Sequence, residues 1–378
     1  MLALSSEQEM LVSSLEDLAR EEFADEAFEW AGEPPWPNVE LLADRGYLGI
    51  NVDEAYGGGG MSEFEAMLTI EAVGRVCPDT AEFLYNQQMV APRAIEMFGT
   101  EAAKERYLPP VTGGEDAIAI AISEPEAGSD VGAMNTRVEE DEQTGDLVVT
   151  GEKIWVSNVR HASAAVVWAK FSEGLGAFVL EFDWDGVEVQ EHYTNMAGHT
   201  QTHFYMEDVT VPEENVLARG RDGFTRVLRA LNWERVGSAT LANSFARCAL
   251  SKALDYADQR EQFGQPIGEF QGMEWKLADM VKELEASRTL TYRAALNARE
   301  AGEAPDRLQT SLAKLYSGEM VERVTSEALQ IHGANGYQQG HPLEYLYRQA
   351  RGRRLAAGTD EVQKNQIASA LKDGGLPR

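Results

Sequence analysis

A single acidic residue interrupts an apolar helix face in the second half of the chain. From Phe224 to Ala257 apolar residues recur every three or four positions, which predicts an amphipathic helix. Its apolar seam would carry Val227, Leu231, Glu234, Ser238, Leu241 and Phe245. Burial raises the pKa of a carboxyl group and makes its ionised form a stronger base, which suits the removal of a proton from carbon. The alternatives are that Glu234 faces solvent or pairs with an arginine such as Arg235.

A second candidate site is the loop Glu124–Asp130, which follows an apolar run over 117–122. Its Gly128 and Ser129 allow backbone N–H groups to come close to an anion, and such a loop suits a pyrophosphate. The alternative is a plain turn between a strand and the next segment.

A third candidate is the pair Trp155 and Ser157, two positions apart in a predicted strand. Alternate residues of a strand share a face, so the indole and the hydroxyl should lie side by side. A flat aromatic ring beside a hydrogen-bonding group suits the edge of an isoalloxazine. The alternative is an ordinary core tryptophan next to a surface serine.

The elements that must position these residues fall into three regions. Helical spacing runs from Ser5 to about Gly114, and strand-like runs follow up to about Gly223. Helical spacing with short breaks then returns, which is typical of a helical bundle. We therefore expect a mainly α chain with a central β domain and domains over 1–116, 117–223 and 224–378. The predicted strands are 117–122, 147–150, 164–169 and 176–182, and the predicted later helices are 224–257, 273–301, 306–332 and 361–371.

The composition is that of a folded protein with more than one packed region. The chain has 378 residues, of which 43% are hydrophobic and 25% charged. No run approaches the about 20 apolar residues of a membrane span, and the first 20 residues read as an acidic amphipathic helix. Cys77 and Cys248 are too few for a disulfide framework or a zinc site. These features predict a cytoplasmic protein without membrane insertion.

The net charge of −30 comes from 63 acidic and 33 basic residues. A surface so negative argues against nucleic acid as a partner. Because the acidic residues are spread along the whole chain, their mutual repulsion should be tolerated best where salt screens it. This pattern predicts a halophilic source, and the alternative is an ordinary acidic cytoplasmic protein.

Six segments, in order, resemble the signatures of the acyl-CoA dehydrogenase family. The resemblance spans nearly the whole chain and implies an N-terminal helical domain, a small β-barrel or sandwich domain, and a C-terminal four-helix bundle. The segments are 122–130, 153–158, 209–217, 256–267 with Phe270 and Gln271, 330–337, and 358–361.

The resemblance implies FAD as cofactor. Within one subunit the matching positions are Ile120, Ile122, Ser123, Gly128, Ser129, Trp155 and Ser157, with Ser123 standing where Thr is usual. Family members complete the site from a neighbouring subunit, and the matching positions are Arg260, Phe263, Gln271, Gln330, Gly333 and Ala334. Arg260 would supply a cation for the FAD pyrophosphate. Thr359 and Glu361, in the last motif, are also expected to contact the cofactor.

Many family members carry the catalytic base as a glutamate directly before the last Gly-Thr, but Ala357 stands there in this chain. Members similar to isovaleryl-CoA and long-chain acyl-CoA dehydrogenases place the base early in the bundle, where the match is Glu234. The backbone N–H of Ala357 would still polarise the thioester carbonyl. Substrate contacts are expected from Ser129, Asn232, Arg235, Ala357 and Gly358.

The reaction implied is α,β-dehydrogenation of an acyl-CoA to the trans-2-enoyl-CoA, in fatty acid or amino acid catabolism. The resemblance also implies an electron-transfer flavoprotein as acceptor and a homotetramer, built as a dimer of dimers. The alternatives are an oxidase, a desulfinase-type reaction and a non-catalytic flavoprotein. Polar residues in 83–88, beside Trp233, favour a short or functionalised acyl group or else face solvent. The segment 196–203 departs from the family pattern, and we expect His199 and His203 to be ordinary loop histidines.

Overall fold

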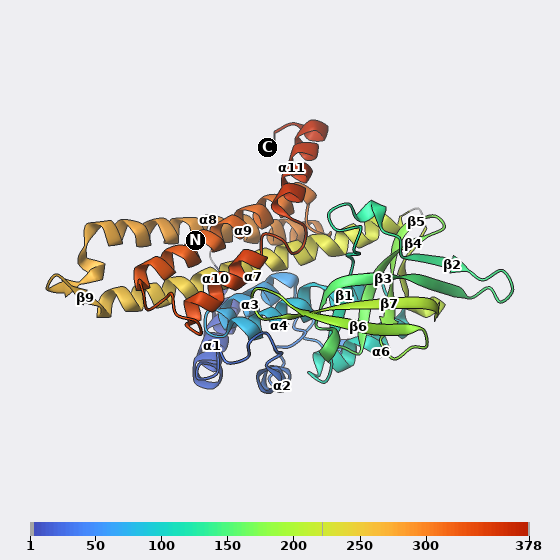
Figure 1. Ribbon diagram of the computed structural model, residues 1–378, viewed down its shortest axis with the longest axis horizontal. Helices are drawn as coiled ribbons and strands as arrows, with labels where there is room; N and C mark the ends of the chain where they lie inside the picture. The colour runs from blue at the N-terminus through green and yellow to red at the C-terminus, as the bar shows by residue number, and fades with distance from the viewer. Residues whose placement is uncertain (1–3, 221, 377–378) are drawn as a thin grey trace. The chain divides into compact units, whose positions relative to one another are not determined.

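The computed structural model describes residues 4–220 and 222–376 (Figure 1). Helices occupy the described chain up to Thr112, strands lie between Ile118 and Ala218, and helices with one short hairpin extend from Gly223 to Gly374. This order confirms the predicted fold class, a central β domain between two helical domains. The predicted boundaries after 116 and 223 fall between α6 and β1 and at the first residue of α7, and they remain predictions.

The chain packs into two compact units, each built from separate stretches. The first unit comprises 1–31, 67–82 and 234–378, and the second comprises 32–66 and 83–233. The short helices are η1 (Ala19–Phe23), η2 (Glu54–Tyr56), η3 (Val131–Ala133), η4 (Val159–His161), η5 (Glu213–Asn215) and η6 (Ile267–Glu269).

The second unit is built on a sheet with the order β6-β7-β3-β2-β4-β5-β8, and β1 pairs in parallel with β4. The strands are β1 (Ile118–Ala121), β2 (Arg137–Glu140), β3 (Leu147–Ser157), β4 (Ala164–Phe171), β5 (Gly174–Glu181), β6 (Val187–Thr194), β7 (Thr200–Val211) and β8 (Val216–Ala218). The sequence predicted β1, β4 and β5 closely, and it predicted β3 in two parts, 147–150 and the stretch that carries Trp155 and Ser157. It did not predict β2, β6, β7 or β8. Of these, β2 and β6 carry few buried residues and so lack the apolar alternation of a half-buried strand.

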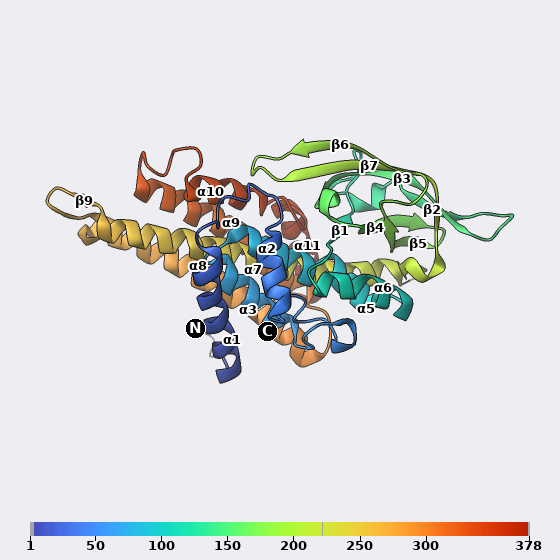
Figure 2. The ribbon, with the colours of Figure 1, turned by 90° about the horizontal axis from the view of Figure 1, so that it is seen from below.

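The sheet has apolar packing on both faces. Along β4, Val166 and Trp168 belong to one core cluster, whereas Val167 and Ala169 belong to another. The first cluster is covered by α5 (Ala91–Phe98) and α6 (Glu101–Thr112), which run along one face of the sheet (Figure 2). The remaining helix that lies wholly in this unit is α2 (Trp36–Asp44).

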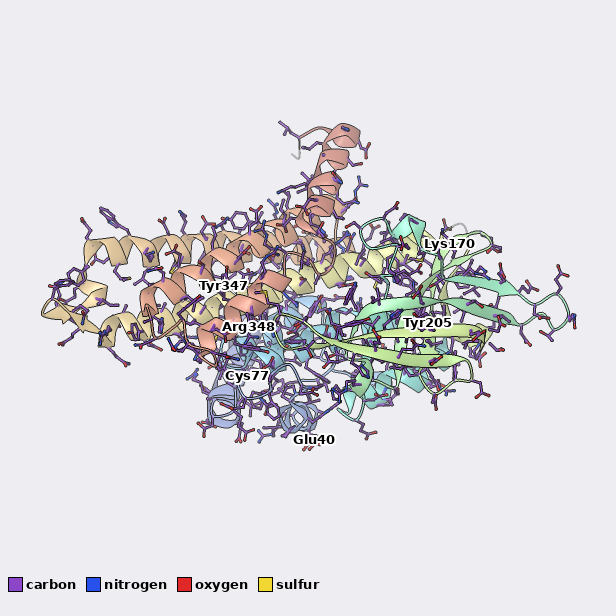
Figure 3. The ribbon with its side chains drawn as sticks, in the orientation of Figure 1. Glu40, Cys77, Lys170, Tyr205, Tyr347 and Arg348 are labelled. Atoms are coloured by element: carbon purple, nitrogen blue, oxygen red, sulfur yellow. The ribbon has the colours of Figure 1, made fainter. Side chains whose placement is uncertain are left out.

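The strand β7, which pairs with the edge strand β6 on one side and with β3 on the other, shows how one prediction failed. Tyr205, labelled in Figure 3, lies on β7 next to His203, and the two rings are 4.6 Å apart. The His203 Nε2 atom lies 2.7 Å from Oε2 of Glu152. The expectation that His203 is a loop histidine is therefore wrong, because it belongs to a strand and pairs across it, whereas His199 does lie outside the strands.

The first unit is helical. Within it α9 packs against α8, α10 and α11. The helices that contribute to it are α1 (Ser6–Leu18), α3 (Glu63–Gly74), α4 (Pro78–Met89), α7 (Gly223–Gln259), α8 (Gln271–Ala301), α9 (Arg307–His332), α10 (Pro342–Gly352) and α11 (Asp360–Gly374), of which α3, α4 and α7 are shared with the second unit. A hairpin of β9 (Glu261–Gln262) and β10 (Gln265–Pro266) joins α7 to α8. No described helix is both long and apolar enough to cross a bilayer.

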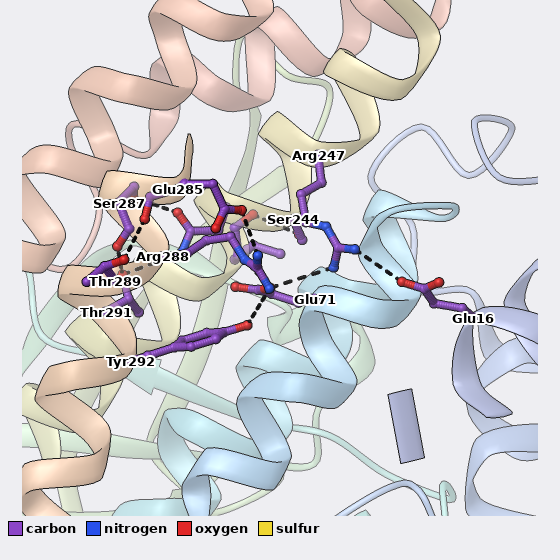
Figure 4. Close-up of polar contacts among 12 residues, drawn as sticks. Glu16, Glu71, Ser244, Arg247, Glu285, Ser287, Arg288, Thr289, Thr291 and Tyr292 are labelled. Carbon is purple, nitrogen blue, oxygen red and sulfur yellow. Dashed lines mark hydrogen bonds and ion pairs between the residues drawn. The ribbon is translucent and has the colours of Figure 1, made fainter. Parts of the chain in front are cut away.

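Buried charges tie these helices together (Figure 4). Glu71 on α3 accepts hydrogen bonds from Arg288 Nε at 3.0 Å and from the Tyr292 hydroxyl at 2.7 Å, both on α8. Arg247 on α7 donates to Glu16 on α1 at 3.2 Å. Since a buried carboxylate without such partners would be costly, these contacts fix the register of the helices that carry the candidate site.

Candidate functional site

Glu234 lies on the buried side of α7, as its place in the apolar seam predicts. Its side chain is 8% exposed, and Val227, Ser238, Leu241 and Phe245 along the same seam are buried. Within the described residues its carboxylate makes no hydrogen bond and no ion pair, so neither the solvent-facing alternative nor a direct pair with Arg235 holds. Burial raises the pKa of Glu234 to about 7, against the opposing charges of Arg235, Lys314 and Arg353.

The loop after α10 approaches this region with two residues in the left-handed conformation. Ala357 has φ +56° and Gly358 has φ +90°. A Cβ at Gly358 would lie 2.9 Å from Nε2 of Gln363, so a larger residue does not fit without movement. Ala357 in this conformation is strained, and the surrounding contacts must hold it there.

Three donors hold the carbonyl groups of that loop. Arg235 Nε donates to the Ala357 oxygen at 3.2 Å, and Lys314 Nζ donates to the Gly358 oxygen at 2.6 Å. Gln363 Nε2 donates to both oxygens, at 3.2 and 3.1 Å. The N–H groups of Ala357 and Gly358 have no acceptor among the described residues. The loop therefore offers backbone donors to a group from outside the chain.

Lys314 and Gln363 were not predicted, although both are buried. Lys314 occupies a seam of α9 whose other members are buried, namely Thr310, Ser317, Val321, Val324 and Ala328. The signal that identified Glu234 was therefore present for Lys314 as well. Gln363 gives no such signal, because its role depends on the turn before α11.

The remaining residues expected near the thioester and the last motif are less enclosed. Asn232 is half-buried on α7. Thr359 is the N-cap of α11, and its hydroxyl accepts from the Val362 N–H at 3.4 Å. Glu361 is exposed in the first turn of that helix, where backbone and Thr359 hydrogen bonds lower its pKa. Gln87 and Gln88, expected to face an acyl group or solvent, are buried and bind backbone carbonyls instead.

In the second unit, the predicted anion loop is anchored by a buried ion pair. Lys153 Nζ donates to Glu124 Oε1 at 2.8 Å and to the Ile122 carbonyl at 3.0 Å. Glu124 also accepts from the backbone N–H groups of Asn135 and Thr136. Burial acts to raise the pKa of Glu124, but these hydrogen bonds outweigh it and hold the pKa below its usual range. The start of the loop is thus fixed, while Gly128 and Ser129 beyond it are exposed.

The neighbouring strand presents an exposed indole. Trp155 is 51% exposed at φ +61°, within an irregular stretch of the β3–β7 pairing. Val156 is buried while Trp155 and Ser157 are exposed, which confirms that the last two share a face. The Trp155 ring lies 5.0 Å from that of Tyr193. Ser123 accepts from the Ile154 N–H at 2.9 Å and so lies beside the same stretch, and Ile120 and Ile122 pack half-buried against the core.

The residues expected to act from another subunit gather at one end of the first unit, near the β9 hairpin (Figure 1). There the Asn335 amide donates to the Tyr256 hydroxyl at 2.9 Å, and the Tyr256 and His332 rings stack at 4.2 Å. Phe263 is 96% exposed at φ +54°. All six residues of the predicted set are exposed: Arg260, Phe263, Gln271, Gln330, Gly333 and Ala334.

Comparison with known proteins identifies the family. Three domain models match, the N-terminal domain of acyl-CoA dehydrogenase over residues 5–115, the middle domain over 119–209 and the C-terminal domain over 221–372. The chain is 33% identical to a probable acyl-CoA dehydrogenase of Bacillus subtilis, covering 97% of this chain and 98% of that protein. It is 35% identical to a 3-sulfinopropanoyl-CoA desulfinase of Paraburkholderia xenovorans, covering 98% and 97%.

The solved structure of a glutaryl-coenzyme A dehydrogenase in complex with glutaryl-CoA superimposes with a TM-score of 0.92 at 30% identity. The match covers 100% of this chain and 97% of the glutaryl-coenzyme A dehydrogenase chain. The order of domains, the length matched and the level of identity agree across these comparisons. The chain therefore belongs to the acyl-CoA dehydrogenase family, a family of FAD-dependent enzymes.

Proposed function

We propose that this protein removes the α and β hydrogens of an acyl-CoA thioester, giving the trans-2-enoyl-CoA, with Glu234 as the base. The observation that carries the proposal is a buried glutamate that has no hydrogen-bond or ion-pair partner among the described residues and a pKa raised to about 7. A carboxylate so placed accepts a proton more readily than an exposed one, because burial penalises its charged form. The placement resembles that of isovaleryl-CoA and long-chain acyl-CoA dehydrogenases.

The thioester carbonyl must be polarised as the α proton leaves. We assign this role to the free N–H groups of Ala357 and Gly358, whose carbonyls are held on their other side by Arg235, Lys314 and Gln363. Such preorganised donors stabilise a developing enolate without reorganisation. Substitution of the usual glutamate by Ala357 removes a side chain but keeps this N–H. Asn232, Arg235, Gly358 and Ser129 complete the proposed substrate contacts.

FAD, if bound at this site, would supply the acceptor for the hydride that leaves the β carbon. The residues proposed to hold it fit a flavin, since Trp155 offers an exposed ring, and Gly128 and Ser129 offer exposed backbone next to an anchored strand. Exposure of a large aromatic residue at a strained backbone angle is typical of a binding site rather than of a core. Ile120, Ile122, Ser123 and Ser157 lie along the same strands.

A second copy of the chain would complete the site. We propose that the exposed group at the β9 end of the first unit, with Arg260 and Phe263 foremost, faces the flavin of a neighbouring subunit in a homotetramer. Among the described residues the Arg260 guanidinium has no acidic partner, which leaves it available for a pyrophosphate. We propose that an electron-transfer flavoprotein accepts the electrons from the flavin and that the protein is cytoplasmic. We also propose that its acidic surface reflects a halophilic source.

The desulfinase relative defines the main competing function, because a related chain acts on a sulfinated acyl thioester. Anaerobic addition of a panel of acyl-CoA thioesters, varied in length and branching and in about molar salt, tests the proposal. Bleaching of the flavin with formation of an enoyl-CoA supports it. Sulfite release from 3-sulfinopropanoyl-CoA without bleaching by any saturated thioester would favour the desulfinase, and no reaction with either would favour a non-catalytic flavoprotein. Rapid reoxidation by oxygen after bleaching would mark an oxidase.

A further inference from the structure

We infer that Lys314 is a positioning residue of this reaction: its buried ammonium holds the Ala357–Gly358 segment behind the thioester carbonyl and supplies a positive charge that favours the ionised form of Glu234. The inference rests on the proposed role of Glu234. None of the six segments that resemble the family includes Lys314. It lies near the N-terminal end of the α9 seam, far along the chain from both Glu234 and Gly358.

The first observation is the environment of the lysine. Lys314 is 1% exposed, and its Nζ donates to the Gly358 carbonyl at 2.6 Å. Among the described residues no carboxylate lies within ion-pair distance of it. A lysine that served packing alone would be expected to carry an acidic partner, as Lys153 does in Glu124 at 2.8 Å, because a buried unpaired charge is costly. Lys314 is buried with no such partner in the described chain and instead donates to the Gly358 carbonyl.

The second observation is the strain in the loop that it binds. Ala357 at φ +56° needs outside contacts to stay in place, and the carbonyl of the next residue is the one that Lys314 holds. A hydrogen bond from a charged donor is worth more than a neutral one, so the ammonium is the strongest of the contacts on the Gly358 oxygen. Within the part of the chain that the structure describes, loss of Lys314 would leave Gln363 as the remaining donor to that oxygen.

The third observation is the set of charges around the lysine. Burial lowers the pKa of Lys314 to about 8, Asp360 opposes this shift, and Arg353, Arg235 and Arg354 add to it. Asp360 is itself held by Arg354 at 2.6 Å, and Arg353 by Glu82 at 3.1 Å. Glu234 has no such partner among the described residues, and the Lys314 charge acts to lower its pKa. Between about pH 7 and 8 the glutamate is therefore at least half ionised, and at least half of the lysine still carries its proton.

The test is the pH dependence of the rate of anaerobic flavin bleaching, measured on the FAD-loaded enzyme with an acyl-CoA found active in the panel. The unmodified enzyme should give a bell-shaped profile whose acid limb reports Glu234 and whose alkaline limb reports Lys314. Lys314→Arg keeps the charge at high pH and should move the alkaline limb upward by at least about one unit. Lys314→Met should lower the maximum rate by at least about 10-fold and move the acid limb to higher pH, because both a charged hydrogen bond and a neighbouring cation are lost.

Lys276→Met is the matched control, since Lys276 pairs with Glu327 on the surface of the same helices and should leave the profile unchanged. FAD content and the melting temperature of each variant show whether it has folded. The inference is overturned if the unmodified enzyme has no alkaline limb near pH 8, or if the Lys314 variants keep the unmodified profile, while Glu234→Gln is inactive. Normal bleaching by Glu234→Gln would instead overturn the proposed function itself, whatever the Lys314 variants do.

Discussion

Glu124 in the second unit and Glu234 in the first are both buried, but their surroundings shift their pKa values in opposite directions. Glu124 is 4% exposed and accepts hydrogen bonds from Lys153, Asn135 and Thr136, which hold its pKa below the usual range. Glu234 is 8% exposed, accepts none among the described residues, and has a pKa raised to about 7. Both side chains are buried, yet the partners of Glu124 favour its charged form, whereas the pKa of Glu234 is raised to about 7.

The difference lies in what surrounds each carboxylate. Glu124 touches its cation directly, so desolvation is offset by a short ion pair and by backbone donors. Around Glu234 the cations Arg235 and Lys314 are directed to the carbonyls of Ala357 and Gly358 instead. A buried carboxylate without partners is destabilised in its ionised form, and binding a proton relieves this cost. We interpret Glu124 as structural and Glu234 as chemical.

The largest effect should come from breaking the satisfied pair. Lys153→Met leaves Glu124 buried without its cation, and we expect it to lower the free energy of unfolding by about 3–5 kcal/mol. Denaturant titration of the FAD-free protein measures this. Lys170→Met, on β4 of the same sheet, is the control and should change stability by less than about 0.5 kcal/mol, since no ion pair of Lys170 is present among the described residues. A comparable small loss for Lys153→Met would remove the contrast between the two glutamates.

The opposite sign is expected for Glu234→Gln. Because the pKa of Glu234 is higher in the folded state, the unfolded state gives up this proton first as pH rises, and stability is lost between about pH 4.5 and 7. A neutral glutamine avoids that loss. The variant should therefore be more stable than the unmodified protein by up to about 3 kcal/mol at about pH 8 and equally stable below about pH 4.5. Glu300→Gln, at an exposed site on α8, is the control and should change stability by less than about 0.5 kcal/mol. A destabilised Glu234→Gln at high pH would contradict the raised pKa of Glu234.

In the second unit, the loop anchored by Glu124 lies beside the exposed ring of Trp155, and the two can be tested separately. Trp155→Ala should weaken FAD binding by about 1–3 kcal/mol, the range found for loss of an aromatic stacking partner. Because the side chain is 51% exposed, the stability of the FAD-free protein should change by less than about 1 kcal/mol. Trp155→Phe keeps a ring and should retain most of the affinity. Isothermal titration with FAD gives the affinities, and an unchanged value for Trp155→Ala would exclude this residue from the site.

The smallest difference concerns salt, which acts on exposed charges and little on buried ones. If the charge of −30 reflects a halophilic source, the melting temperature should rise by several degrees as KCl increases from about 0.1 to 2 M. The difference between Glu234→Gln and the unmodified protein should persist across this range, because Glu234 is shielded from solvent. A melting temperature that is flat or falls with salt would count against the halophilic origin.

The sequence predicted the three-region fold and the seam position of Glu234 because both follow from periodicity. It also predicted that Trp155 and Ser157 share a face. It could not predict that Gln363 binds two carbonyls, or that Glu124 and Lys153 pair, because these contacts join segments that no local pattern relates. The burial of Lys314 could have been predicted from its position on the α9 seam, as that of Glu234 was from the α7 seam. The strands β2 and β6 were missed because they carry few buried residues, and α10 was missed between the predicted helices.

We propose as the base Glu234, a buried carboxylate without a hydrogen-bond or ion-pair partner among the described residues. Stopped-flow measurement of anaerobic flavin bleaching, with Glu234→Gln compared against the unmodified enzyme at equal FAD occupancy and saturating acyl-CoA, tests it most directly. This role for Glu234 predicts that substrate still binds to Glu234→Gln and perturbs the flavin spectrum, while the bleaching rate falls by at least about 100-fold, the lower end of the contribution of a general base. A bleaching rate within a few-fold of the unmodified enzyme would contradict it.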